Sequence, residues 1–350
     1  MLLVYSLLIF TASNIQRTNL SQDRLSDLPD EILVSILSLL KLEESQRTSI
    51  LSRRWRYLWT FVTCNLVFDK QGCNLTALSS ERSKFIVWVN DVLELHQGDT
   101  IDEFRVFFDM DGTFSTVLDN WISFSMRKKV KKLSLNLSTL GCRKYSLASQ
   151  PLQSYSLESL TDLSLTNVEV TGEVLKYILS NCPFIEILHV EASRTLMNLK
   201  TSCPLPKLKH LKIIYCQCLE HIQIHAINLV SFEYFGCGTT RILLGDHFCR
   251  FPKLPKLRNL RLLKLDIHRL FMDGILCCTS FLTASPMLQR IVLKFVGLDD
   301  PQMDGEINVR RDTCPHQCLK VVEFIVGGLE TPHPEFIQKT PHPDVTSICV

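Results

Sequence analysis

Leu160-Thr-Asp-Leu163-Ser-Leu165-Thr-Asn167 is the clearest copy of a short pattern that recurs along this chain. Neighbouring residues of a strand point to opposite faces, so Leu163 and Leu165 would enter a core while Ser164 faces outward. One copy is weak support, because many buried strands share this alternation. The number and the spacing of the copies decide the fold.

The pattern occurs nine times between residues 101 and 324, at intervals of 21 to 31 residues. This interval is the length of a leucine-rich repeat, which holds a strand, a turn and a return segment. Because one unit cannot cover its own apolar face, such units stack into a solenoid. The fourth positions of the nine copies are Phe104, Leu133, Leu163, Leu188, Leu211, Phe232, Leu260, Ile291 and Val322.

The return segments between the copies differ in pattern. Residues 172–180 have apolar residues at helical spacing, whereas residues 219–224 alternate and favour an extended segment. The sequence therefore predicts an α/β protein in which a helical N-terminal unit precedes an irregular leucine-rich-repeat solenoid.

Residues 23–60 form that helical unit. Asp27-Leu28-Pro29-Asp30-Glu31 predicts a helix start, because proline in the first turn loses no hydrogen bond and acids suit the positive end of the helix dipole. Apolar residues follow at three- and four-residue spacing, and two further short helices are expected over 43–51 and 53–59. So small a unit of three helices cannot hide all of its apolar surface, which indicates a partner.

The composition is that of an ordinary globular protein, with 350 residues of which 46% are hydrophobic and 21% charged. A net charge of +2 gives no overall field that would draw the chain to nucleic acid or to an acidic membrane, and neither partner is expected. The 14 cysteines are scattered without the paired spacing of a zinc site. We therefore expect a reducing compartment, with no metal and no other cofactor.

Signatures of enzymes are missing from the sequence, which contains no GxGxxG, GxxxxGK[ST], HExxH or GxSxG motif. Asp109-Met-Asp111-Gly112 opens like a calcium loop but lacks the later acidic ligands, so a turn between repeats is the better interpretation. The basic run at 127–132 is interpreted as the solvated start of a strand rather than as a nucleic-acid patch. No catalytic residue is predicted.

Residues 23–59 resemble a plant F-box in two stretches, Asp23-Arg-Leu-Ser-Asp-Leu-Pro-Asp-Glu-Ile-Leu33 and Arg47-Thr-Ser-Ile-Leu-Ser-Arg-Arg-Trp-Arg-Tyr-Leu-Trp59. The repeats resemble those of plant F-box/leucine-rich-repeat proteins, and Asn181-Cys-Pro-Phe-Ile-Glu186 has the style of that family. Residues 314–323 resemble the opening of the FBD domain, which often closes such chains.

The resemblance implies a non-catalytic substrate receptor of an SCF-type cullin ubiquitin ligase, located in the cytoplasm, the nucleus or both. Its F-box would bind a Skp-type adaptor, and its repeats would bind a protein substrate that the sequence does not name. Lys41, where the family has proline, and Gln46, where a small apolar residue is usual, would weaken adaptor contact. The predicted adaptor-binding residues are Leu28, Pro29, Ile32, Leu33, Ile36, Leu51, Trp55 and Trp59.

The outward-facing residues of the strands are the predicted substrate surface. They are polar and of mixed charge, which is typical of protein recognition, although a plain solvated sheet face has the same composition. Phe235 is the aromatic among them, and aromatic side chains are common anchors of binding. The predicted substrate-binding residues are His189, His210, Lys212, Glu233 and Phe235, with Ser134, Asn136, Asp162, Ser164, Thr166 and Glu191 on the same face.

These patterns divide the chain into six segments. The tail is expected to form neither helix nor sheet, because Thr331-Pro-His-Pro334 recurs as Thr340-Pro-His-Pro343. The segments are an apolar extension (1–20), the F-box (21–68), a linker (69–95), leucine-rich repeats (96–300), a partial FBD-like segment (301–327) and a flexible tail (328–350).

Two alternative functions stay open at this point. One is a divergent F-box/leucine-rich-repeat protein that acts as an interaction module without recruiting the ligase. The other is a secreted leucine-rich recognition protein, which the apolar residues 1–10 favour and the missing basic residues before them disfavour.

Overall fold

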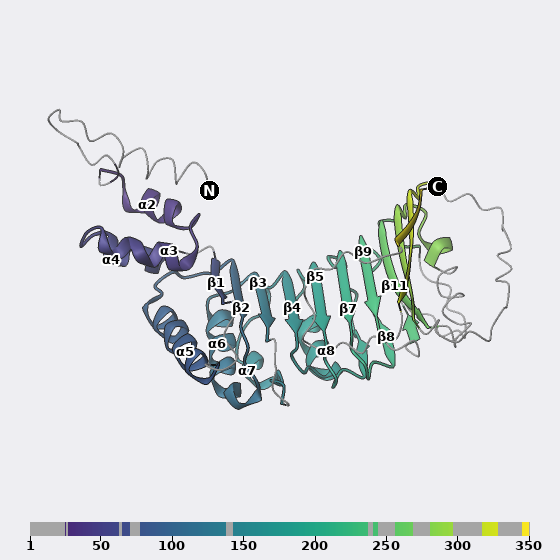
Figure 1. Ribbon diagram of the computed structural model, residues 1–350, viewed down its shortest axis with the longest axis horizontal. Helices are drawn as coiled ribbons and strands as arrows, with labels where there is room; N and C mark the ends of the chain where they lie inside the picture. The colour runs from purple at the N-terminus through teal and green to yellow at the C-terminus, as the bar shows by residue number, and fades with distance from the viewer. Residues whose placement is uncertain are drawn as a thin grey trace. The chain divides into compact units, whose positions relative to one another are not determined.

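The chain divides into two compact units, Met1–Val62 and Thr63–Val350. Figure 1 shows the described helices of the first unit in purple and the second unit in blue to yellow. The computed structural model describes residues 25, 27–62, 65–70, 78–137, 143–236, 241–243, 256–268, 281–296, 317–327 and 345–349.

The first unit consists of short helices, namely α2 (Asp30–Leu37), α3 (Leu42–Arg47), η1 (Thr48–Ile50), α4 (Trp55–Leu58) and η2 (Trp59–Phe61). Pro29 precedes α2, and its carbonyl accepts the N–H groups of Ile32 and Leu33, both at 3.1 Å. The predicted second and third helices each end in a 3₁₀ turn. The buried apolar residues of this unit are Leu33, Leu37, Leu42, Trp55, Leu58, Trp59 and Val62.

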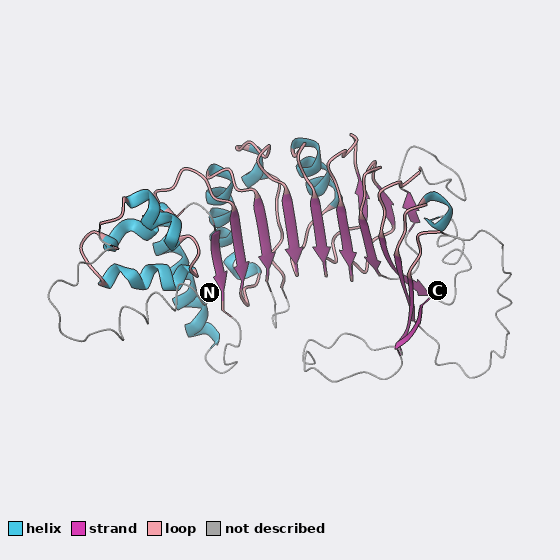
Figure 2. Ribbon diagram, turned by 90° about the horizontal axis from the view of Figure 1, so that it is seen from above, coloured by secondary structure: helices cyan, strands magenta, loops and turns pink. Residues whose placement is uncertain are grey.

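The second unit is built on one long sheet, whose arrows lie side by side in Figure 2. Its strands run parallel and in chain order, except that the last pairs antiparallel with its neighbour. In order across the sheet, the described strands are β1 (Asn65–Asp69), β2 (Glu103–Phe107), β3 (Lys132–Asn136), β4 (Asp162–Thr166), β5 (Ile187–Glu191), β7 (His210–Ile214), β9 (Ser231–Phe235), β11 (Leu262–His268), β12 (Arg290–Val296), β13 (Val321–Gly327) and β14 (Val345–Cys349).

Adjacent repeats are in register at the predicted fourth positions. Leu163 of β4 pairs with Leu133 on one side and with Leu188 on the other, and the row continues through Leu211 to Phe232. All five side chains are at most 2% exposed. The predicted α/β solenoid is confirmed by this row, because it requires the same alternation in every repeat.

One predicted copy of the pattern is wrong. Leu263, three residues beyond the predicted Leu260, is the residue of β11 that pairs with Phe232. Leu257 and Leu260 lie in the turn before β11, and both are fully buried. Their three-residue spacing therefore imitates the start of the strand pattern, although they are buried as turn residues.

The two faces of the sheet are different. Helices cover the face that carries the buried residues of the strands, whereas the other face, the open face below, carries the residues between them. The stacking of Phe85 on Phe108, with ring centroids 4.0 Å apart, holds the first covering helix in place. The described elements on the covered side are α5 (Leu78–Leu95), η4 (Gly112–Phe114), α6 (Ser115–Arg127), α7 (Gln150–Gln153) and α8 (Gly172–Asn181).

The covering layer changes from helix to strand along the chain. The helix predicted at 172–180 is α8, and the extended segment predicted at 219–224 contains β8. From β5 onward the return segments are the short strands β6 (Asn198–Lys200), β8 (His221–Gln223) and β10 (Arg241–Leu243). These three pair parallel with one another in a sheet of their own, so the solenoid is irregular as predicted.

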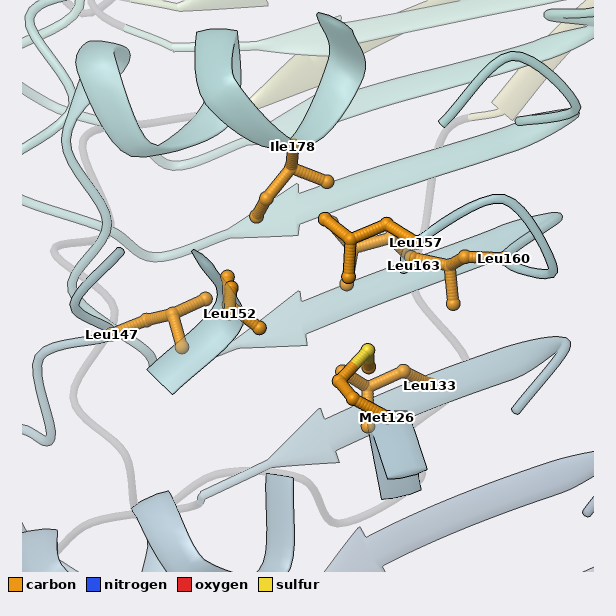
Figure 3. A pocket seen from close by; sticks show the side chains of 8 residues that line it. All are labelled: Met126, Leu133, Leu147, Leu152, Leu157, Leu160, Leu163 and Ile178. Carbon is orange, nitrogen blue, oxygen red and sulfur yellow. The ribbon is translucent and has the colours of Figure 1, made fainter. Parts of the chain in front are cut away.

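Helices and sheet meet in an apolar interior with a small gap between α6, α7 and α8 (Figure 3). No polar side chain lines this gap, so it is part of the core and not a place for a polar ligand. Its lining residues are Met126, Leu133, Leu147, Leu152, Leu157, Leu160, Leu163 and Ile178.

The chain leaves three neighbouring strands through the same backbone conformation. Asn167, Ala192 and Tyr215 follow β4, β5 and β7, and have φ values of 57°, 58° and 53°. Their N–H groups donate to the last residue of the next strand, at 2.9, 2.8 and 2.6 Å. Such left-handed conformations strain side chains with a Cβ, so the hydrogen bonds between repeats must outweigh that strain.

Several boundaries differ from the predicted segments. β1 and α5 belong to the second unit, although the sequence placed them in the F-box and a linker. β13 continues the parallel sheet through the segment interpreted as FBD-like, and β14 lies in the predicted tail. Backbone pairing across a sheet tolerates many sequences at its ends, so composition alone did not reveal these strands. Residues 1–20 lie outside the described residues.

Candidate functional site

The helical unit exposes a different set of apolar residues from the predicted one. Leu33, Trp55 and Trp59 were predicted to bind an adaptor, but they are 0%, 7% and 7% exposed. This assignment is corrected: a buried side chain supports the unit and offers no surface. Ile32 and Leu51, by contrast, are 47% and 61% exposed.

The remaining predicted positions lie at the surface to differing degrees. Pro29 is exposed, and Leu28 and Ile36 are half-buried. Arg54 donates to the Leu28 carbonyl at 2.6 Å and pairs with Asp30 at 2.6 Å, which fastens the start of α2 to the start of α4. Pro29 is therefore held at a fixed place on the surface of this unit.

Four exposed apolar residues of this unit escaped the sequence analysis. Leu39, Ile50, Tyr57 and Phe61 are 75%, 88%, 55% and 44% exposed. Leu39 and Ile50 follow helix ends, where the periodicity that separates inner from outer faces is lost. Within the described part of this unit, they and Leu51 carry the most exposed apolar side chains.

The open face of the sheet carries the predicted substrate residues in straight rows. The middle row runs through Ser134, Ser164, His189, Lys212, Glu233 and Lys264, which are successive register partners. His210 and Ser231 lie in the row before it, Glu191 and Phe235 in the row after it. The five predicted residues are half-buried, so the structure brings all of them to one face.

His189 is the centre of a hydrogen-bonded relay. Its Nδ1 lies 3.1 Å from the Ser164 hydroxyl and its Nε2 lies 3.1 Å from Oε2 of Glu191. A carboxylate accepts only, so Nε2 carries a proton, and in the neutral imidazole Nδ1 accepts from Ser164. The hydrogen bond from His189, helped by the charges of His189 and Lys212, lowers the pKa of Glu191, although burial acts to raise it.

Hydroxyl, imidazole and carboxylate stand in the order of a hydrolase triad. Acyl transfer also needs donors for the oxyanion, usually free backbone N–H groups. Ser164 lies in the middle of β4, between β3 and β5, where the sheet's hydrogen bonds occupy the backbone N–H groups. The relay fixes the direction of its hydrogen bonds and lacks an oxyanion hole in the described part of the chain, so it is better suited to recognition.

The other predicted residues are held by neighbours on adjacent strands. Nδ1 of His210 lies 2.8 Å from the Ser231 hydroxyl, and Glu233 pairs with Lys264 at 3.2 Å. Fixed side chains lose little entropy when a partner binds. The open face is thus a preorganised polar surface with Phe235 at one end.

The loop that resembles a calcium site contains an internal cation instead. Arg82 pairs with Asp109 at 2.8 Å and with Asp111 at 3.5 Å. Burial acts to raise the pKa of Asp111, but hydrogen bonds from Thr113 and the charge of Arg82 lower it overall. The predicted turn is the correct interpretation, because the guanidinium takes the place of a metal ion. Among the described residues no group of three or more His, Cys, Asp and Glu could hold a metal.

Comparison with known proteins identifies both units. Residues 25–65 match the F-box domain model, and residues 148–254 match the model of the At1g61320/AtMIF1 leucine-rich-repeat domain. The chain carries both domains of the F-box/leucine-rich-repeat proteins. None of the helices in the described ranges is long and apolar enough to cross a membrane.

Relatives from Arabidopsis thaliana have the same two domains in their names. F-box/FBD/LRR-repeat protein At1g13570 is 30% identical over 188 residues, covering 48% of this chain and 44% of its own length. FBD-associated F-box protein At4g10400 is 27% identical over 260 residues, covering 68% and 60%. F-box/LRR-repeat protein At3g03360 is 29% identical over 194 residues, covering 47% and 38%. The chain spans about half the length of the curated relatives it matches.

Proposed function

We propose that this chain is a substrate receptor of an SCF-type cullin ubiquitin ligase. F-box domains generally bind Skp-type adaptors, and F-box/leucine-rich-repeat proteins are typically non-enzymatic. The observation that carries the proposal is the exposed apolar surface of the unit that matches the F-box model, above all Leu39, Ile50 and Leu51. Exposed apolar surface of this kind on a small helical unit is typical of a protein interface.

We place this function in the cytoplasm or the nucleus, where the ligase would act. The free thiols of Cys182, Cys203, Cys216, Cys218 and Cys318 support a reducing compartment. Fluorescent tagging of the chain tests the location, and a signal from the secretory pathway would contradict it.

Adaptor binding is tested with the full chain and a purified Skp-type adaptor. The substitutions Leu39→Asp and Ile50→Asp place two charges on side chains that are 75% and 88% exposed, so the unit keeps its fold. They are expected to weaken binding at least about tenfold, because an unpaired charge must be desolvated at the interface. Val87→Asp, at an apolar residue of α5 that is 58% exposed, is the matched control. Unchanged binding of the double variant would refute the proposed surface.

A second candidate function is an interaction module that does not recruit the ligase, and Lys41 and Gln46 favour it. The backbone at Lys41, with φ −65° and ψ 150°, already suits proline. If the parent chain fails to bind the adaptor and the double variant Lys41→Pro, Gln46→Ala binds it, this second function is supported. Proline there would remove the N–H that donates to Glu44 Oε2 at 3.2 Å, so the single variant Gln46→Ala is the control.

Substrate binding is proposed for the open face. Substituting His210, Lys212 and Phe235 together by alanine should leave adaptor binding intact, because these residues lie in the second unit. A substrate captured by the parent chain should bind this triple variant at least about tenfold more weakly, since truncating anchor side chains commonly costs this much. Equal affinity for both proteins would remove the open face as the substrate site.

A further inference from the structure

The turns that lead into the strands form a continuous edge of the sheet, called the turn edge below. Because the strands are parallel, these turns all lie at the tails of the arrows in Figure 2. Each turn donates a backbone N–H to the one before it, at 2.7 to 2.9 Å, from Lys209 through Val230, Arg261 and Gln289 to Lys320. The turn edge comprises residues 182–186, 205–209, 226–230, 256–261, 285–289 and 317–320.

Every second turn of this edge exposes a large apolar side chain. Phe184 precedes β5, Ile227 precedes β9 and Met287 precedes β12, and they are 53%, 57% and 43% exposed. The buried leucines and isoleucine of the same turns fill the core, so these three are additional to the apolar residues that the solenoid needs. Their exposure needs an explanation outside the fold.

The turns between them are basic. Lys207 precedes β7, Lys256, Arg258 and Arg261 precede β11, and Lys320 precedes β13, and all five are exposed. The single acid of the turn edge, Glu186, is already paired with Lys209 at 2.8 Å. Apolar and basic turns thus alternate along the edge, with a clear excess of positive charge.

The repeat distance of this alternation fits a helix. Adjacent strands lie about 4.8 Å apart, so successive apolar turns are separated by about 9.6 Å. Seven residues of an α-helix rise about 10.5 Å, and residues at i, i+3 or i+4, and i+7 share one face. An extended chain covers the same distance in about three residues, which would turn every second anchor away from the edge.

The turn edge is also rigid. Pro183, Pro206 and Pro286 fix the backbone directly before Phe184, Lys207 and Met287. Two amide side chains join neighbouring turns: Asn228 donates to the Pro206 carbonyl at 2.9 Å, and Asn259 donates to Asn228 Oδ1 at 3.1 Å. A preorganised surface of this kind loses little entropy when a partner binds.

We propose that the turn edge docks an acidic amphipathic helix of a partner protein. The helix lies across the strand ends, with apolar residues seven positions apart over Phe184, Ile227 and Met287. Its Asp or Glu residues, three or four positions after each apolar one, meet the lysines and arginines between them. This surface is separate from the F-box and from the open face, so it stands or falls independently of the proposed ligase function.

The probe is a synthetic alanine-rich helix with leucine at every seventh position and glutamate three and four residues after each leucine. Its affinity for the full chain is measured by fluorescence anisotropy. We expect binding that weakens with salt, because surface charges are screened. Phe184→Ser, Ile227→Ser and Met287→Ser combined, and Lys207→Glu with Arg258→Glu, should each reduce the affinity at least about tenfold.

Matched controls use similar side chains elsewhere in the second unit. Val87→Ser with Leu95→Ser replaces apolar residues of α5 that are 58% and 48% exposed, and Lys176→Glu reverses an exposed charge on α8. These variants should bind the probe like the parent. Thermal unfolding midpoints equal to that of the parent show that each variant is folded.

Three results would overturn the proposal. The first is no binding of the acidic helix by the parent chain at about 1 mM, the limit of weak association. The second is equal binding of a probe in which lysine replaces glutamate. The third is binding of a single-stranded oligonucleotide that competes with the probe and survives the three serine substitutions, since the edge would then attract any polyanion.

Discussion

Substituting Ala192 by glycine is expected to stabilise the second unit. Ala192 follows β5 with φ 58°, in the left-handed region. A Cβ in that region costs about 1–2 kcal/mol, and glycine avoids this cost. Glycine also makes the unfolded chain more flexible, which acts in the opposite direction by about 0.4–1 kcal/mol. The net gain in the free energy of unfolding should be about 1 kcal/mol.

The contacts of Ala192 support this estimate. Its N–H donates to the Ile214 carbonyl at 2.8 Å, and its own carbonyl accepts from Nζ of Lys144. Both contacts use backbone atoms of residue 192, so glycine keeps them. Loss of one methyl group from a half-buried position subtracts only a few tenths of a kcal/mol.

Urea unfolding of the full chain measures the effect, with Ala148→Gly as the matched control. Ala148 is exposed and has no positive φ, so its substitution should only destabilise. Opposite shifts of the two midpoints are therefore expected. Equal losses of stability in both variants would refute the claim that Ala192 is strained.

Three further predictions concern other parts of the molecule. Gly172→Ala should cost about 1–3 kcal/mol, since a Cβ there would lie 2.0 Å from the Asn198 carbonyl oxygen; thermal unfolding against the parent tests this. Trp55→Ala should cost about 3–5 kcal/mol in the first unit, where the side chain is 7% exposed; faster limited proteolysis within residues 27–62 of the full chain is the expected sign, and unchanged cleavage would contradict it. The lowered pKa of Glu191 predicts a contribution to stability that is complete above the unfolded-state pKa of 4.5 and is lost as the pH falls through the lower folded-state pKa; His189→Ala should reduce this acid-induced loss, and an identical pH profile would exclude the relay as its source.

The strand rows could be predicted from the sequence because alternation in a strand fixes which face each residue occupies. His189, Lys212 and Glu233 were placed on one face before their register was known, and the pairing of β5, β7 and β9 aligns them in a single row. The error at Leu260 shows the limit of this approach. Buried residues of a turn can have the same spacing as the first half of the strand pattern.

The helical unit was harder to interpret, because a short helix has too few turns to separate its inner face from its outer face. Trp55 and Trp59 were assigned to an interface and are buried, whereas Ile50 lies in a 3₁₀ turn and is 88% exposed. Periodicity also gives no information about contacts between repeats of unequal length. The alternation of Phe184, Lys207 and Ile227 along the turn edge could be seen only after the turns were aligned in space.

The change of the covering layer from helix to strand affects how strongly the sheet bends. Packed helices need about 8–10 Å between their axes, while neighbouring strands are about 4.8 Å apart. Repeats between β2 and β5, which return through α6, α7 and α8, must therefore be wedge-shaped, wider on the covered side than on the open side. Repeats that return through β6, β8 and β10 have nearly equal widths on both sides. A partner on the open face would thus meet a hollow over the first group of strands and a level floor over the second, and the relay on β4 and β5 lies at the boundary between them.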